Sequence, residues 1–210
     1  METPEISLEL IKEFTYWAHL SATKGLVNCS SGNLSHRFKN DCMLISETGS
    51  WLENITIEQI SMIDLNNGQL RNKVEPSGEW RLHDAVYKHR PDTKVILHFQ
   101  SPYATTIACS KDIPDYNAII EVPVYIGEVA HIPYLLPGSK QLADAVAEAS
   151  SKSCMIQLTN HGQVALGKSY KEIIEKAIFF ELCCKIIVEA GNKYQAIRSV
   201  DLPQLSNYRK

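Results

Sequence analysis

The stretch "VILHFQSPYATTIACS", residues 95–110, joins a predicted strand to polar side chains at the point where that strand ends. Val95, Ile96 and Leu97 form a short apolar run that is typical of a buried strand. His98 and Gln100 follow, and because alternate residues of a strand point to one face, we expect their side chains to project together. A metal site would favour a second histidine at this spacing, and the chain has glutamine there.

Composition and charge exclude several classes of function. The chain has 210 residues, of which 44% are hydrophobic and 21% charged, as in ordinary globular proteins. The net charge of −3 offers no basic surface for nucleic acid, and no apolar run reaches the ~18–20 residues of a membrane span. The N-terminus has no basic region leading into an apolar core, and the six cysteines form no C-x-x-C pair. We therefore predict a cytoplasmic protein with reduced cysteines that binds neither nucleic acid nor membranes.

Capping signals and β-branched runs predict an α/β domain around a mixed sheet. The first helix is expected to open at Thr3-Pro4, and four more should follow hydroxyl residues that can cap a helix: Thr56, Ser77, Ser139 and Ser169. Strands are expected at residues 42–46, 94–99, 122–127, 131–135, 154–159 and 163–167. The sequence contains no internal repeat, no low-complexity tract and no long linker, which indicates a single domain over residues 1–210.

Three further segments carry candidate chemistry. In "TNHGQVALG" (159–167), His161 leaves a predicted strand and a glycine follows, so its ring can reach a pocket or can simply be structural. In "EPSGEW" (75–80), Ser77 and Glu79 suit a helix start, and the same free amides and hydroxyl could bind a phosphate beside a carboxylate base. The loops "CSSGNLSHR" (29–37) and "SETGSW" (46–51) either turn the chain or bring backbone amides close to an anion.

Taken together and in this order, the motifs resemble the class II aldolase/adducin family and its bacterial sugar-phosphate aldolases. The motifs are "SSGNLSHR" (30–37), "LISETG" (44–49), "PSGEW" (76–80) with His83, "RPD" (90–92) with "VILH" (95–98), and "LTNHG" (158–162). The likeness extends from the first predicted helix to the last. It implies a three-layer α/β/α domain with a central mixed sheet, and a homotetramer whose active sites lie between subunits.

The resemblance also implies a reaction and a set of site residues. The reaction would be zinc-dependent retro-aldol cleavage of a ketose 1-phosphate, such as L-fuculose 1-phosphate, to dihydroxyacetone phosphate and a hydroxyaldehyde. One Zn2+ per subunit would be held at the positions of His98, Gln100 and His161, with Glu79 as the catalytic acid/base. The positions that match the phosphate pocket of the family are Gly32, Asn33, Thr48, Gly49, Ser77 and Gly78.

Gln100 departs from the family pattern, because the family has a metal-binding histidine at this position. An amide oxygen is a harder and weaker zinc ligand than imidazole. Gln100 could coordinate through its oxygen, could leave the metal to His98, His161, Glu79 and water, or could mark the loss of metal and catalysis. We expect the metal to be retained, because His98, His161 and Glu79 are all present.

Two other questions stay open at this point. The family's aldehyde-side proton donor is a tyrosine from a neighbouring subunit, and neither Tyr116 nor Tyr125 aligns cleanly with it, while Tyr208 near the C-terminus could close over the site. A 4-epimerase, a dehydratase or a decarboxylase of the same superfamily would use a similar metal site. A non-catalytic adducin-like binding module would need no metal.

Overall fold

A seven-stranded mixed sheet forms the centre of the computed structural model, which describes residues 6–39, 42–205 and 208. The strand order is β3-β2-β1-β4-β7-β6-β5, and every neighbouring pair is antiparallel except β5 and β6. The strands are β1 (Asn33–Phe38), β2 (Cys42–Ser46), β3 (Ile60–Asp64), β4 (Val95–Phe99), β5 (Val129–Ile132), β6 (Met155–Leu158) and β7 (Gly162–Gly167). The sheet thus places β4, which carries the "VILHF" run, in its middle.

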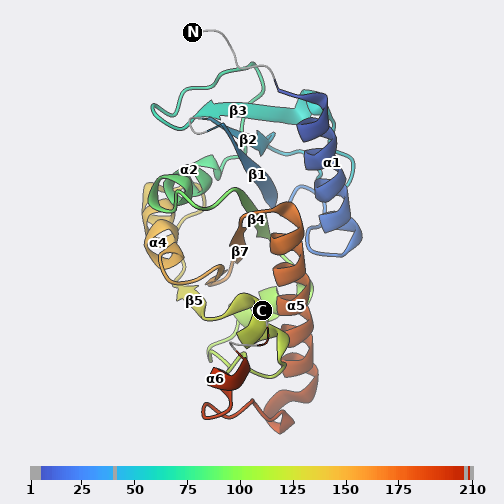
Figure 1. Cartoon of the computed structure of the whole chain (residues 1–210), viewed down its shortest axis with the longest axis vertical. Coiled ribbons are helices and arrows are strands. Elements are labelled where there is room, and N and C mark those ends of the chain that lie inside the picture. The colour runs from blue at the N-terminus through green and yellow to red at the C-terminus, as the bar shows by residue number, and fades with distance from the viewer. Residues whose placement is uncertain (1–5, 40–41, 206–207, 209–210) are drawn as a thin grey trace.

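Helices cover both faces of the sheet, with α2 and α4 on one side and α1 and α5 on the other (Figure 1). The α-helices are α1 (Leu8–Thr23), α2 (Trp80–His89), α3 (Pro102–Ala108), α4 (Lys140–Ser150), α5 (Tyr170–Ala190) and α6 (Leu202–Leu205). Shorter turns are η1 (Ile57–Gln59), η2 (Val122–Ile126) and η3 (Gly191–Lys193). The predicted three-layer α/β/α architecture is therefore confirmed.

Strand β4 contributes to a separate hydrophobic core on each face of the sheet. Leu97 and Phe99 pack in the core that α1 and α5 cover, whereas Ile96 packs under α2 and α4. Because side chains alternate along a strand, His98 shares the face of Ile96 and points toward α2. The strand thereby delivers an imidazole to the start of that helix.

Most expected elements are present, and several capping signals act as predicted. Ser139 accepts a hydrogen bond from the Leu142 amide at 3.1 Å, and Ser169 accepts one from the Glu172 amide at 3.3 Å. The first helix begins at Leu8 with Ser7 as its N-cap. The predicted opening at Thr3-Pro4 lies outside the described residues.

Three sequence predictions are wrong. Residues 33–37, expected as part of a polar loop, belong to β1, which pairs with β2 and β4. Residues 122–127 form the π-helical turn η2 instead of a strand, because Pro123 cannot donate to a strand ladder while Val122 and Ile126 both reach the core at helical spacing. The capping box at Thr56 and Gln59 exists, but it opens only the single turn η1. The next residues form β3 because they pair with β2 and are all buried, so tertiary pairing overrides the local helix signal.

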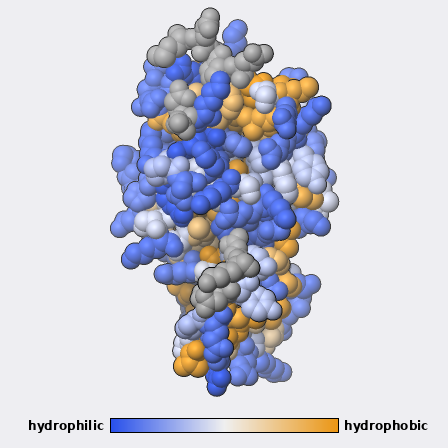
Figure 2. Space-filling model, viewed as in Figure 1, coloured by the Kyte–Doolittle hydropathy of each residue, from blue (hydrophilic) through white to orange (hydrophobic). Residues whose placement is uncertain are grey.

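Polar side chains cover most of the face shown in Figure 2, and apolar ones gather toward α1 and along α5 and α6. Exposed large apolar residues include Leu8 and Tyr16 of α1 and Leu182 and Val188 of α5. Within the described residues, no helix is long and apolar enough to cross a membrane.

Candidate active site

A cavity of about 280 Å³ opens beside the end of β4, at the start of α2. The loops before β1, after β2 and between β6 and β7 complete its wall. All of the site residues that the sequence predicts line this one cavity: Gly32, Asn33, Thr48, Gly49, Ser77, Gly78, Glu79, His98, Gln100 and His161. Segments far apart in the chain therefore meet where the sequence motifs place them.

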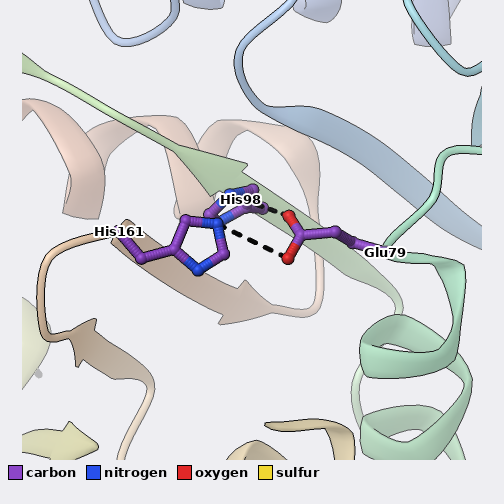
Figure 3. A group of neighbouring side chains, drawn as sticks. All are labelled: Glu79, His98 and His161. Atoms are coloured by element: carbon purple, nitrogen blue, oxygen red, sulfur yellow. Dashed lines mark ion pairs between the residues drawn. The ribbon is translucent and has the colours of Figure 1, made fainter. Parts of the chain in front are cut away.

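Glu79, His98 and His161 point toward one another inside the cavity (Figure 3). Glu79 is the N-cap residue of α2, His98 lies in β4, and His161 lies in the turn before β7. Oε2 of Glu79 is 3.0 Å from Nε2 of His98, and Oε1 of Glu79 is 3.5 Å from Nε2 of His161. One ligand atom from each residue lies within 4.8 Å of the others, which is close enough for all three to bind one ion.

The hydrogen bonding of His98 leaves the lone pair of its Nε2 atom available to a metal ion. The Nδ1–H group donates to the carbonyl oxygen of Gln163 at 2.9 Å, so in the neutral ring the lone pair sits on Nε2 and faces Glu79. A backbone acceptor behind a metal-binding imidazole is the usual device that fixes its tautomer and ring orientation.

Charge and burial act against each other at this cluster. Burial raises the pKa of Glu79, but the two neighbouring imidazoles outweigh it and hold the pKa of the carboxyl well below its usual range. Burial lowers the pKa of His98, and the Glu79 carboxylate outweighs that effect, so the pKa of His98 is raised. The cluster therefore carries a carboxylate that stays ionised at neutral pH.

The donor set fits a divalent cation. Two imidazole nitrogens and a carboxylate oxygen are ligands that zinc and other first-row divalent metals accept. Oε1 of Glu79 and Nδ1 of His161 are buried and make no hydrogen bond within the part of the chain that the structure describes. Buried polar atoms without partners are costly, and a bound ion would satisfy that carboxylate oxygen.

Gln100 lines the same cavity, and its main chain is firmly held. Its N–H group donates to Leu26 O at 3.0 Å. Helix α3 starts just beyond it, and the amides of Tyr103 and Ala104 both donate to the carboxylate of Glu181 on α5 at 2.9 Å. The backbone at position 100 is thus fixed from both sides, and whether its amide oxygen binds a metal stays a prediction.

The opposite side of the cavity offers amides and hydroxyls and no lysine or arginine among its described lining residues. Gly32 has φ +84°, and a Cβ there would lie 2.7 Å from the carbonyl oxygen of His98. Ser77 is buried, and its Oγ accepts a hydrogen bond from the Glu79 amide at 3.3 Å. An anion at this end would be held by neutral donors.

The cavity also contains residues that the sequence prediction missed: Ser30, Ser31, Glu47 and Pro137. Ser30 and Ser31 lead into Gly32, and Glu47 directly precedes Thr48, so their position in the quoted loops could have indicated them. Pro137 had no such signal. It comes from the loop before α4, which lies so close to Gly78 that a Cβ on Gly138 would be 2.9 Å from the Gly78 carbonyl oxygen.

The three candidate tyrosines lie away from the cavity of their own chain. Tyr116 is buried against His131 and Phe180, and Tyr125 packs against Phe179. Tyr208 is 78% exposed. Within the described residues, no tyrosine lines the cavity.

Comparisons with known proteins agree with this arrangement. The sequence profile of the family described as "Class II Aldolase and Adducin N-terminal domain" matches residues 12–188. The 3-oxo-tetronate 4-phosphate decarboxylase of Haemophilus influenzae is 29% identical over 192 residues, covering 89% of this chain and 91% of that protein. The L-fuculose phosphate aldolase of the same organism is 30% identical over 180 residues, covering 85% of this chain and 78% of that protein. The crystal structure of YgbL from Escherichia coli, titled a putative aldolase/epimerase/decarboxylase, superposes with a TM-score of 0.89 at 26% identity, covering 94% and 98%.

Proposed function

This chain belongs to the class II aldolase and adducin family, whose enzymes are metal-dependent, and we propose that it decarboxylates a 3-oxo sugar-acid phosphate. The observation that carries the proposal is the meeting of Glu79, His98 and His161 in one cavity whose other side offers neutral donors for a phosphate. The chemical class of substrate is taken from relatives named 3-oxo-tetronate 4-phosphate decarboxylase. These relatives align over a larger share of both chains than the fuculose phosphate aldolase does.

The reaction follows from the structure of such a substrate. The carboxylate at C1 is β to the carbonyl at C3, so loss of CO2 breaks the C1–C2 bond and leaves the electron pair delocalised over C2 and the C3 oxygen as an enediolate. A proton at C2 then gives dihydroxyacetone phosphate. When bound, a divalent cation supplies a Lewis acid that stabilises negative charge on the substrate oxygens.

Residues of this chain would bind, orient and protonate the substrate. His98 and His161 would hold the cation, with Gln100 or Glu79 as a further ligand, and Glu79 would pass a proton from solvent to C2. The phosphate would be bound by the hydroxyls of Thr48 and Ser77, the Asn33 side chain and the main-chain amides of Gly32, Gly49 and Gly78. Binding there orients the reacting bond from a distance. Zn2+ is the proposed ion, one per subunit, because imidazole and carboxylate are its common ligands.

Retro-aldol cleavage of a ketose 1-phosphate, such as L-fuculose 1-phosphate, is the second candidate. It is favoured by the relatives named L-fuculose phosphate aldolase, and it leaves the same enediolate of dihydroxyacetone phosphate. It also requires a second proton transfer, at the hydroxyl that becomes the aldehyde. We place decarboxylation first because the decarboxylases align over a larger share of both chains.

A product assay distinguishes the two reactions. Metal-loaded protein would be incubated with 3-oxo-tetronate 4-phosphate and, separately, with a panel of ketose 1-phosphates, and CO2, aldehyde and dihydroxyacetone phosphate would be measured. We expect CO2 and dihydroxyacetone phosphate from the first substrate. Aldehyde from a ketose phosphate would support the second candidate instead. Absence of all three products from metal-loaded protein would reject both reactions.

We also infer a single domain over residues 1–210 and a homotetramer with active sites between subunits. Exposed apolar side chains on α1 and α5 support association, because such side chains gather where partners bind (Figure 2). Light scattering coupled to size-exclusion chromatography would measure the number of subunits, and metal analysis of the same peak would give the ion content per chain.

A further inference from the structure

A chain of buried hydrogen bonds runs from the cavity wall into the space between the sheet and α2. Asn33, at the start of β1, faces His83 of α2, with its Oδ1 atom 2.5 Å from the ring Nε2. The ring Nδ1 lies 2.7 Å from Oγ of Ser35, and that oxygen lies 2.8 Å from the hydroxyl of Tyr87. Asn33, Ser35, His83 and Tyr87 are all at most 5% exposed. Solvent therefore does not compete for these contacts.

The direction of the hydrogen bonds follows from the Asn33 end of this chain. An amide oxygen only accepts, so the single ring hydrogen of a neutral His83 sits on Nε2 and is donated to Asn33 Oδ1. Nδ1 of His83 then accepts from the Ser35 hydroxyl. At the far end, the Tyr87 hydroxyl lies beside Ser35 Oγ and donates to Lys94 O at 3.2 Å.

Burial keeps His83 neutral. Its side chain is fully buried, and burial first, with the positive charge on His98 second, lowers the pKa of His83 to about 3, although Glu79 opposes the shift. A neutral imidazole donates from one nitrogen and accepts at the other. The contacts of Ser35 and Asn33 use one of these functions each.

The orientation of the Asn33 amide decides what the cavity offers to an anion. With Oδ1 held by His83, the Nδ2 group is left for the cavity, and it forms no hydrogen bond within the described residues. If the ring carried its hydrogen on Nδ1, Nε2 would accept from the amide nitrogen. The amide oxygen would then face the cavity and repel an anion.

We propose that His83 is a positioning residue: its Nε2–H tautomer, in which Nδ1 accepts from Ser35, holds the Asn33 amide so that Nδ2 donates to the phosphate of the substrate. The inference rests on the proposed function in one respect only, that the cavity takes a phosphorylated substrate. It adds a polar relay, the hydrogen-bonded set Tyr87, Ser35, His83 and Asn33, that joins α2 and β1 to the phosphate end of the cavity.

Binding of inorganic phosphate to metal-loaded protein tests the relay without turnover. Asn33→Ala should weaken phosphate binding by about 10–100-fold, since it removes a hydrogen bond to a charged group. His83→Asn keeps an acceptor near Ser35 but cannot reach Asn33, and it should weaken binding by about 3–10-fold. His83→Gln can place an amide N–H near the position of Nε2 and should recover most of that loss. Thermal unfolding of each variant checks that it is folded.

A double-mutant cycle separates positioning from general damage. In an Asn33→Ala background, His83→Asn should cause no further loss of phosphate affinity, because the group through which it acts is gone. The matched cycle with Ser77→Ala should instead be additive, since Ser77 lines the cavity without contacting His83. Additive losses in the Asn33 cycle, or phosphate binding by folded His83→Asn equal to that of wild type, would overturn the proposal.

A nitrogen NMR spectrum of the histidine rings gives a second readout. The wild-type His83 ring should show a protonated Nε2 and a bare Nδ1. The opposite tautomer would overturn the proposal, as would wild-type protein that turns over substrate without binding inorganic phosphate. Conversely, the expected cycle and tautomer in a protein that yields no product from either substrate would reject the proposed function and retain the relay.

Discussion

The carboxylate of Glu79 and the imidazole of His98 meet at 3.0 Å between Oε2 and Nε2, although one side chain opens helix α2 and the other ends strand β4. The contact depends on the layered fold, because α2 must lie across the face of the sheet to which His98 points. It also places the proposed proton-transferring group directly beside a proposed metal-binding nitrogen. The role of Glu79 is therefore open to a direct test.

Glu79→Gln preserves the size of the side chain and removes its charge. We expect the metal to remain on the two histidines and turnover to fall by roughly 10²–10⁴-fold, the usual range for loss of a general acid or base. Steady-state kinetics together with metal analysis of the purified variant measure both effects. Turnover close to that of wild type would remove Glu79 from the proton-transfer role.

Thr48→Ala combined with Ser77→Ala should damage the phosphate end of the cavity alone. Each replacement removes a hydroxyl, so KM for the phosphorylated substrate should rise by about tenfold or more. The unphosphorylated analogue serves as the control and should show little change. Equal losses for the two substrates would contradict the assignment of these residues to the phosphate.

Gln100→His should rebuild a three-imidazole site if residue 100 faces the ion. Because imidazole is the better zinc ligand, we expect slower loss of metal to a chelator. His98→Ala serves as the reference and should lose the metal outright. Chelator sensitivity unchanged in Gln100→His, beside metal loss in His98→Ala, would indicate a two-histidine site completed by Glu79 and water.

Gly32→Ala and Gly49→Ala form a matched pair on the cavity wall. Both glycines have positive φ, +84° and +71°, so each substitution should cost about 1 kcal/mol of backbone strain. At Gly32 the new Cβ would also lie 2.6 Å from Val27 Cγ1 and 2.7 Å from His98 O, whereas Gly49 has nothing within 4 Å. Denaturant unfolding should therefore show the larger loss of stability for Gly32→Ala, and equal losses would refute the steric argument.

Acid should destabilise the fold below pH 6.5 through two histidines. Burial first, and Lys94 second, lower the pKa of His36 to about 4, and burial lowers that of His83 to about 3. The unfolded chain therefore binds protons first as the pH falls, and each group should cost about 2 kcal/mol of stability between pH 7 and pH 5. The stabilisation that the two neutral histidines contribute is fully present above about pH 6.5 and is lost as the pH falls below it.

His36→Phe provides the measurement for one of these groups. Unfolding free energies at pH 7 and pH 5 should differ by about 2 kcal/mol less in His36→Phe than in wild type. An unaltered pH dependence in His36→Phe would contradict the assignment of His36.

Local signals predicted the residues of the site better than they predicted the elements between them. His98, Glu79 and His161 each sit beside a strand end or a helix start, and such positions are marked by caps, glycines and short apolar runs. The resemblance of these motifs, in their order, to the class II aldolase/adducin family then implied that they form one site. Their shared cavity confirms that they lie together, while their chemical roles stay predictions.

The failures have a common physical cause. Residues 60–64 follow a true capping box, and only their pairing with β2 makes them a strand. Val122 and Ile126 lie in an apolar run that suits a strand as well as a turn of helix. The contact of Asn33 with His83 joins residues fifty positions apart and has no local signature. Such features depend on tertiary contacts that a short window of sequence does not contain.

The hydrogen bonds that fix the main chain around Gln100 have a genetic consequence. Leu26 O accepts the N–H group of that residue, and the Glu181 carboxylate accepts two amides of the helix that follows. None of these hydrogen bonds involves the side chain at position 100. Glutamine and histidine share the first two bases of their codons, and one base change at the third converts either into the other. If residue 100 faces the ion as proposed, a single base change would therefore exchange its amide oxygen for a softer and stronger imidazole donor without any change in the main-chain contacts around it.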